Sequence, residues 1–401
     1  MFTNTKPAVS DVERCAVCSG SALHTLMELP GLPLTDLPWQ EEPVTDLPDG
    51  IDQRMLICSS CGHGQLAHQV DPAFLYGGSN YTYRTDSSAM SARMVSFFLD
   101  FLQALEPERS FRCALEIGCN DLHLLKRLEG MAGDRVGVDP IWRGREHERE
   151  EDAIKVIGAT LEEVNLGTEL PERPDLVIAR HTIEHMARPA EVVRQVVEAA
   201  APDALFIFEQ PRLESLVRRQ RFDQVFHQHY QYFTLASLTR LFENAGAHYL
   251  THRDNYHHWG AMLVAFRKSG TAAGERPEDG LNIAEIESRL DLFRRQMAAT
   301  RDILRTLSAA PIYGYGAALM LPVLDYHLDH ELCRLTGVLD DDESKDGLFY
   351  ANLPLGIVHP KRLEGAEPET IFITATEHAR PLLTKLMAQR PRHVIYPFHV
   401  I

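Results

Sequence analysis

The stretch Leu115–Glu116–Ile117–Gly118–Cys119–Asn120–Asp121 closes a short apolar run and leads directly into the helical pattern at 124–128. A glycine at such a switch from strand to helix lets the backbone approach a ligand closely. Open α/β sheets bind their cofactors at this carboxyl edge. The stretch therefore predicts a Rossmann-like sheet with a small-molecule site above its first strand.

Short apolar runs that alternate with helical patterns extend this prediction through the middle of the chain. An amphipathic helix is expected from 87 to 105, ahead of the first strand. Strands that alternate with helices form a mostly parallel sheet covered on both faces, so we predict an α/β fold. The expected strands lie at 113–118, 135–139, 153–158, 175–180, 204–209, 248–253 and 261–266.

The acidic residues around this loop indicate the cofactor. Asp139 ends the second expected strand, 21 residues after Gly118, where a carboxylate accepts hydrogen bonds from ribose hydroxyls. The pattern GxGxxG is absent, and an acidic first turn would repel a pyrophosphate. A sulfonium with an amino group suits these carboxylates, so we predict S-adenosylmethionine. The expected cofactor residues are Glu116, Gly118, Asn120, Asp121, Asp139, Pro140, Arg180 and His181.

Two CxxC pairs near the start of the chain predict a structural zinc site. Cys15 and Cys18 form the first pair, and Cys58 and Cys61 form the second, with 39 residues between the pairs. Four thiolates suit a closed tetrahedral zinc site, which leaves no open position for catalysis. Because the segment is short and rich in Pro and Asp, we expect the metal to act as its core.

A connecting helix is expected at 281–309, followed by a second, smaller α/β unit. Gly314 and Gly316 form a GxG turn without a third glycine, and Asp340 follows Gly314 by 26 residues. Contact with a diphosphate, a scaffold role and an NAD site all remain open for this turn. The expected domains are 1–75 (zinc-binding), 76–280 (cofactor-binding) and 281–401 (α/β, substrate-binding), and the strands of the last lie at 311–316, 335–340, 370–376 and 393–397.

Composition narrows the class of protein. The 401 residues carry a net charge of −17, which disfavours nucleic acids and anionic membranes as partners. No apolar run is long enough for a membrane span, and no secretory signal is visible. Seven cysteines are too few for a disulfide scaffold, so we expect a cytoplasmic protein. The sequence does not predict an oligomeric state.

The ordered motifs resemble the sugar C-methyltransferase family, which acts on nucleotide-linked ketosugars. The likeness spans nearly the whole chain and rests on the CxxC pairs, Tyr81–Thr82–Tyr83, the stretch 116–121 and Phe226–His227–Gln228–His229. It implies a zinc-binding N-terminal domain, a class I methyltransferase domain and a C-terminal α/β domain. It also implies a nucleotide diphosphate sugar as substrate and a place in deoxysugar and antibiotic biosynthesis.

Methylation of a sugar carbon requires an enolate, and histidine is the natural base near neutral pH. The resemblance implies that His229 takes the proton, that His227 holds or polarises the ketone, and that His185 and Tyr81 line the pocket. At two positions of the presumed site relatives carry Tyr and Glu, where this chain has Phe226 and Gln228, and we count Gln228 among the candidate catalytic residues. These departures indicate a changed substrate, a changed proton route or lost catalysis.

Other interpretations remain. His181–Thr182–Ile183–Glu184–His185 has the spacing HxxEH of inverted metalloproteases, but its strand context favours a methyltransferase. Methyl transfer to N or O needs less base strength than transfer to carbon. An NAD-dependent enzyme that uses the C-terminal unit is a further alternative.

Overall fold

A computed structural model describes residues 8–37, 39–43, 49–76, 89–147, 154–255, 260–269, 281–307, 310–363 and 369–398. Tyr81, a predicted site residue, lies outside the described residues.

The central part forms a seven-stranded sheet in the order β12-β13-β10-β9-β6-β7-β8. All pairings are parallel except those of β13, which is antiparallel to both neighbours. The chain runs outward from β6 to β8 and then returns to β9 on the other side of β6, so a crevice forms where β6 and β9 end. This arrangement confirms the predicted class I methyltransferase sheet. The strands are β6 (Phe111–Ile117), β7 (Ala132–Val138), β8 (Ile154–Ile157), β9 (Leu176–Arg180), β10 (Leu205–Pro211), β12 (His248–Asn255) and β13 (Ala261–Arg267).

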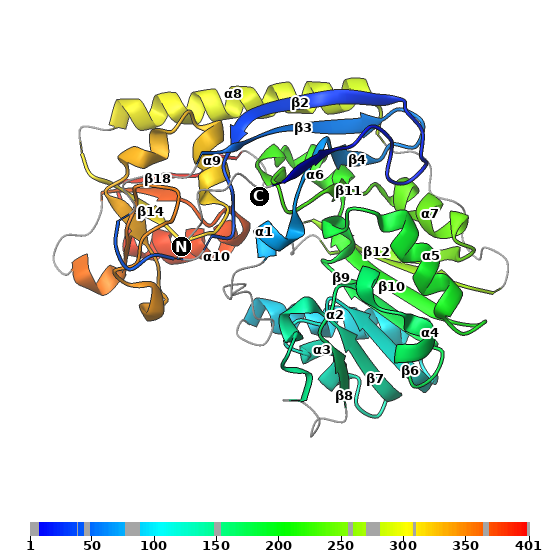
Figure 1. Ribbon diagram of the computed structural model, residues 1–401. Helices are drawn as coiled ribbons and strands as arrows, with labels where there is room; N and C mark the ends of the chain where they lie inside the picture. The colour runs from blue at the N-terminus through cyan, green and yellow to red at the C-terminus, as the bar shows by residue number, and fades with distance from the viewer. Residues whose placement is uncertain are drawn as a thin grey trace.

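Helices cover both faces of this sheet because its strands are apolar on both sides. Ala114 faces a core that includes Phe98 of α2 and Leu125 of α3. Its neighbour Leu115 faces the opposite core, with Leu238 of α7. The covering helices, drawn around the sheet in Figure 1, are α2 (Ala89–Leu105) and α3 (His123–Arg127) on one face, and α4 (Leu166–Glu169), α5 (Pro189–Ala199) and α7 (Leu235–Asn244) on the other.

The N-terminal segment forms a four-stranded sheet, order β11-β4-β3-β2, and a pair of strands, β1 and β5. β2 and β3 run beside the long helix α8 (Ile283–Leu307) (Figure 1), and His24 Nε2 lies 3.0 Å from Glu287 Oε1. Leu29 of β2 and Leu290 of α8 belong to one core. The expectation that metal alone forms the core of this segment is therefore wrong. The other elements are β1 (Val9–Asp11), β2 (Leu23–Leu32), β3 (Ile51–Cys58), β4 (Gly64–Leu66), β5 (His68–Val70), α1 (Pro72–Tyr76), α6 (Leu213–Arg219) and β11 (Gln231–Tyr232).

β11 joins the N-terminal sheet although it belongs to the central part of the sequence. Its residue Gln231 pairs with Gln65 of β4. The N-terminal and central segments thus share a sheet, and the boundaries at 75 and 280 stay predictions.

The C-terminal part is a five-stranded parallel sheet in the order β16-β15-β14-β17-β18, which confirms the second α/β unit. Its order again reverses next to the first strand, β14. β16 is only two residues long, and the sequence analysis missed it. The elements are β14 (Ile312–Tyr315), α9 (Leu321–His327), β15 (Gly337–Leu339), β16 (Ile357–Val358), β17 (Thr370–Ile373), α10 (Ala379–Gln389) and β18 (His393–Ile395).

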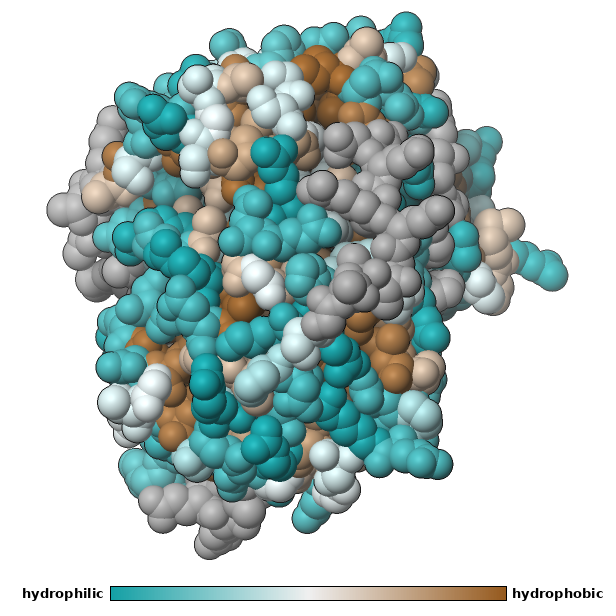
Figure 2. Space-filling model, turned by 90° about the vertical axis from the view of Figure 1, so that its right-hand side faces the viewer, coloured by the Kyte–Doolittle hydropathy of each residue, from teal (hydrophilic) through white to brown (hydrophobic). Residues whose placement is uncertain are grey.

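None of the described helices combines the length and the apolar character that a membrane-spanning segment requires. The face drawn in Figure 2 is mostly hydrophilic, and its apolar residues lie in small separate patches.

Candidate active site

The loop after β6 packs against the loop after β9. Thr182 Oγ1 donates a hydrogen bond to the carbonyl oxygen of Ile117 at 3.2 Å. Gly118 has φ +72°, and a Cβ atom there would lie 2.2 Å from Thr182 Oγ1. The glycine is thus required where the two loops meet, which adds a packing reason to its predicted role in ligand approach.

Asp139 directly follows β7, and its carboxylate binds backbone amides at the edge of the sheet where β6 and β7 end. Its Oδ2 accepts a hydrogen bond from the amide of Asn120 at 2.9 Å, and its Oδ1 accepts one from Ile141 at 3.0 Å. Trp142 Nε1 donates to the carbonyl oxygen of Asn120 at 2.6 Å. Pro140 opens the short helical turn η1 (Pro140–Trp142), which Asp139 caps.

Glu116 is buried in β6, and its Oε2 has no hydrogen-bond partner among the described residues. Burial raises its pKa to about 8, although Arg180 opposes this shift. Arg180 itself donates from Nε to Glu209 Oε2 at 2.7 Å. A buried carboxyl with one oxygen unpartnered among the described residues suits a cationic ligand, because such a ligand would compensate the charge that burial disfavours. The donor set at this edge therefore fits an amino and sulfonium ligand, while Arg180 is engaged by protein.

Three histidines lie near this edge: His181 and His185 come after β9, and His229 comes after η5 (Phe222–Gln224). His185 lies in the helical turn η4 (Ile183–His185), and its ring centroid is 4.8 Å from that of His229. His181 Nδ1 lies 3.4 Å from Glu184 Oε1. Burial lowers the pKa of His185 and that of His229 below the usual 6.5, so both rings are neutral near pH 7.

His227 and Gln228 face the N-terminal segment, although the sequence analysis placed them in the catalytic site. His227 Nε2 donates to the carbonyl oxygen of Leu32 at 3.0 Å, and Gln53 Nε2 lies 3.5 Å from His227 Nδ1. Gln228 forms two hydrogen bonds with Thr35. The structure thus brings His185 and His229 together, with His181 beside them, and leaves His227 and Gln228 in other contacts.

Two buried residues of this region were not among the predicted site residues. Glu184 is 1% exposed, and neither of its carboxylate oxygens has a hydrogen-bond partner among the described residues. Gln210, near the end of β10, is fully buried, and both its amide atoms lack a partner in the described part of the chain. The spacing of His181, Glu184 and His185 was the only sequence signal for Glu184.

The four cysteines of the two CxxC pairs meet in one cluster. The Sγ atoms of Cys15 and Cys61 lie 3.5 Å apart, and those of Cys18 and Cys58 lie 3.6 Å apart. All four Sγ atoms lie within 4.8 Å of one another, and none forms a disulfide. Sulfur atoms about 2.3 Å from a tetrahedral zinc ion lie about 3.8 Å apart, so the cluster fits zinc.

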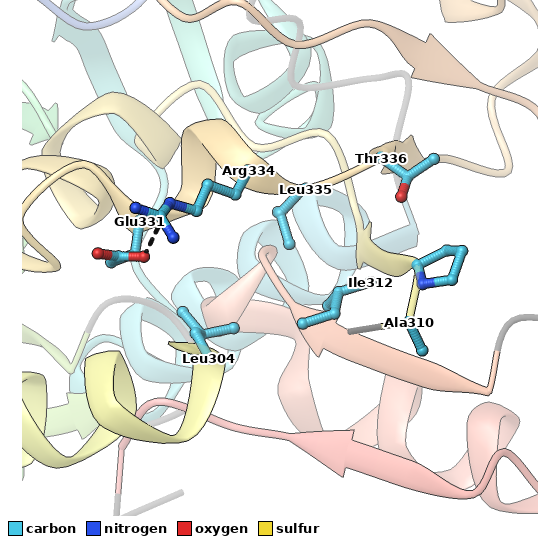
Figure 3. Close-up of a pocket in the computed structure, with 8 residues that line it drawn as sticks. Leu304, Ala310, Ile312, Glu331, Arg334, Leu335 and Thr336 are labelled. Atoms are coloured by element: carbon cyan, nitrogen blue, oxygen red, sulfur yellow. Dashed lines mark ion pairs between the residues drawn. The ribbon is translucent and has the colours of Figure 1, made fainter. Parts of the chain in front are cut away.

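The C-terminal unit holds a hollow of about 410 Å³ away from these residues (Figure 3). Arg334 Nε lies 3.2 Å from Glu331 Oε2 at its side. None of the predicted site residues lines it. The lining residues are Leu304, Ala310, Pro311, Ile312, Glu331, Arg334, Leu335 and Thr336.

The glycine turn after β14 is occupied by protein groups. Asp340 Oδ2 accepts a hydrogen bond from the amide of Ala317 at 2.7 Å. The helix α9 begins only at Leu321, so no helix starts directly at Gly316.

Comparisons with known proteins agree with this geometry. Residues 89–252 match the family described as a methyltransferase domain. The chain is 28% identical to the C-methyltransferase NovU of Streptomyces niveus over 358 residues, which cover 82% of this chain and 81% of that protein. The chain is a homologue of the C-methyltransferase NovU.

Solved structures of methyltransferases are also similar to part of this chain. The N-methyltransferase NodS of Bradyrhizobium japonicum WM9 is 17% identical and covers 45% of this chain and 98% of its own, with a TM-score of 0.35. The 1,6-didemethyltoxoflavin-N1-methyltransferase of Burkholderia thailandensis is 18% identical and covers 46% of this chain and 80% of its own, with the same TM-score of 0.35. Because residues 89–252 match a methyltransferase domain and the chain is similar to NovU over most of its length, it is an S-adenosylmethionine-dependent methyltransferase.

Proposed function

We propose that the protein transfers a methyl group from S-adenosylmethionine to a carbon of a nucleotide-activated keto-deoxysugar. One observation carries this proposal: the loop that bears His185 touches the cofactor loop, through the hydrogen bond from Thr182 to Ile117. Neutral imidazoles therefore stand at the same edge of the sheet as Glu116 and Asp139. Similarity to a C-methyltransferase supports carbon as the acceptor.

The chemistry needs one proton removed from the carbon next to the ketone. We assign this proton to His229, whose buried ring is neutral and can accept it. S-adenosylmethionine supplies an electrophilic methyl group, which the enolate carbon takes while the sulfur–carbon bond breaks and S-adenosylhomocysteine leaves. His185 donates from Nδ1 to the carbonyl oxygen of Gln228 at 2.8 Å, which fixes its ring beside His229.

Other residues would bind the two small molecules. Glu116 and Asp139 would hold the amino group and the ribose of the cofactor. Gln210 would pair its amide with hydroxyl groups of the sugar, because a buried amide without partners is costly. We further propose that residues 281–401 bind the nucleotide and that the four-cysteine cluster holds a structural zinc ion.

Incubation with S-adenosylmethionine and a panel of nucleotide ketosugars in D₂O tests the proposal. We expect one new C–CH₃ group by NMR and exchange of the neighbouring carbon-bound proton before transfer. A product methylated on N or O, with no exchange at carbon, would replace the carbon acceptor. Asp139→Asn should lose cofactor affinity in calorimetry, while Asp134→Asn, exposed on β7, should keep it.

A further inference from the structure

Glu184 is a buried carboxylate that accepts no hydrogen bond from the described residues. It is 1% exposed, and both oxygens lack a hydrogen-bond partner among the described residues. A buried ionised carboxylate costs several kcal/mol unless a positive charge compensates it. The groups around it include the imidazoles of His181, His185 and His229.

Two imidazoles face this carboxylate at distances that suit a shared ion. One ligand atom each from Glu184, His185 and His229 lies within 4.8 Å of the others, yet the carboxylate hydrogen-bonds to neither ring. Because His185 donates from Nδ1 to the Gln228 carbonyl oxygen, the lone pair of its neutral ring is on Nε2. Such a bond from the second ring nitrogen is what orients histidines that bind metals. We propose that Glu184, His185 and His229 together bind a divalent cation.

The donor set indicates which ions fit. Two imidazoles and one carboxylate suit Mn²⁺, Fe²⁺, Co²⁺ or Zn²⁺ and leave positions open for other ligands. His181, whose Nδ1 lies 3.4 Å from Glu184 Oε1, stands next to the site as a fourth polar neighbour. The segment 181–185 follows the end of β9 and contains a single helical turn, so the site is not the helical motif of a metalloprotease.

The use of the ion in catalysis rests on the proposed function, whereas its binding does not. A cation at this place would stabilise negative charge on the oxygen of the acceptor as the carbon loses its proton. With the ion bound, the lone pair of His229 is on the ion, and a hydroxide at one of the open positions of the ion would take the proton. Without the ion, His229 acts as the base assigned above.

Titration of the purified protein with Mn²⁺, followed by electron paramagnetic resonance, tests the site without any acceptor. Mn²⁺ is suitable because it competes poorly for the thiolates of the cysteine cluster. We expect stoichiometric binding to the wild-type protein and at least about tenfold weaker binding to Glu184→Gln. Glu184→Asp, which keeps the charge, should bind more tightly than Glu184→Gln.

Glu191→Gln is the matched control, because Glu191 is exposed on α5 and its ion pair within the described part of the chain is with the exposed Arg188. It should bind Mn²⁺ like the wild type. Equal binding by Glu184→Gln and wild type, or no binding by wild type at millimolar Mn²⁺, would overturn the site. Cofactor binding and unfolding temperature, measured on the same samples, show that each variant is folded. Either failure leaves the methyltransferase assignment intact.

Discussion

Thr35 and Gln228 hold each other through two hydrogen bonds although 193 positions separate them in the sequence. Thr35 Oγ1 donates to Gln228 Oε1 at 2.7 Å, and Gln228 Nε2 donates to the carbonyl oxygen of Thr35 at 2.9 Å. Together with the bond from His227 to Leu32, this exchange fixes the segment that carries His229. The N-terminal segment thus helps to position His229 through contacts with the two residues that precede it.

Gln228→Ala should therefore act on stability. It would leave the buried Thr35 hydroxyl and carbonyl without partners, which costs about 1–3 kcal/mol. Urea unfolding should show this loss, whereas Gln40→Ala, at a partly buried side chain elsewhere, should cost less. A large loss of turnover at unchanged stability would return Gln228 to the catalytic residues.

Much of the fold could be predicted from the sequence. The inner strands of the central sheet, β6, β9, β10 and β13, are buried on both faces, so they stand out as apolar runs. Of these, β6, β9 and β13 lie within two residues of their expected bounds. β2 and β3 were missed because their exposed and buried residues alternate irregularly. Their apolar sides are covered by α8, which lies more than 200 positions away, and a local pattern cannot show such a partner.

The site could be predicted only in part. Gly118 and Asp139 follow strands in a regular α/β order, so their place at the sheet edge follows from topology. His227 and His229 lie in an irregular turn, where no period tells which ring faces the cofactor edge. The contacts of His227 with Leu32 and Gln53 direct its ring toward the N-terminal segment.

Gly118→Ala should lower the free energy of unfolding by more than the cost of placing alanine at a positive φ angle. Gly130 has φ +78° with nothing within 4 Å of an added Cβ, so Gly130→Ala measures the backbone cost, about 1–2 kcal/mol. At Gly118 the clash with Thr182 adds a further cost of about 1–3 kcal/mol. Chemical unfolding and calorimetry of cofactor binding compare the two. Equal losses would show that Thr182 moves aside.

Cofactor binding should release a proton through Glu116. Because its pKa is raised to about 8, this carboxyl is mostly protonated at pH 7, and a bound cation would favour its ionised form. Affinity should therefore rise with pH from 6 to 9. Calorimetry in buffers of different ionisation enthalpy should detect the released proton in the wild type and lose it in Glu116→Gln. Glu129→Gln, at an exposed position, should behave like the wild type, and an equal proton release by Glu116→Gln would assign the proton elsewhere.

Cys58→Ser should remove the metal from the N-terminal segment. Three thiolates bind zinc less tightly than four, so metal analysis should fall from stoichiometric zinc to a small fraction. The sheet of β2 and β3 also packs on α8, and we expect the circular dichroism spectrum to persist at a lower unfolding temperature. Ser59→Ala, at an exposed position in the same turn, should retain zinc. Full zinc in Cys58→Ser would exclude Cys58 as a ligand.

The activity of this protein should stay constant through neutral pH and fall only in acid. Burial lowers the pKa of His229 below 6.5, and the neighbouring His185 and His181 lower it further, so the ring stays neutral down to a pH below that value. Protonation removes the lone pair that enolisation needs, so kcat/KM should decline as pH falls through the lowered pKa. His229→Ala should lose about 100-fold or more of both methyl transfer and deuterium exchange, whereas His24→Ala, at an exposed ring on β2, should lose neither. Burial and the neighbouring rings only lower the pKa of His229, so its titration should lie below pH 6.5. A fall in kcat/KM that begins above pH 6.5 and persists in His229→Ala would assign the titrating group to another residue.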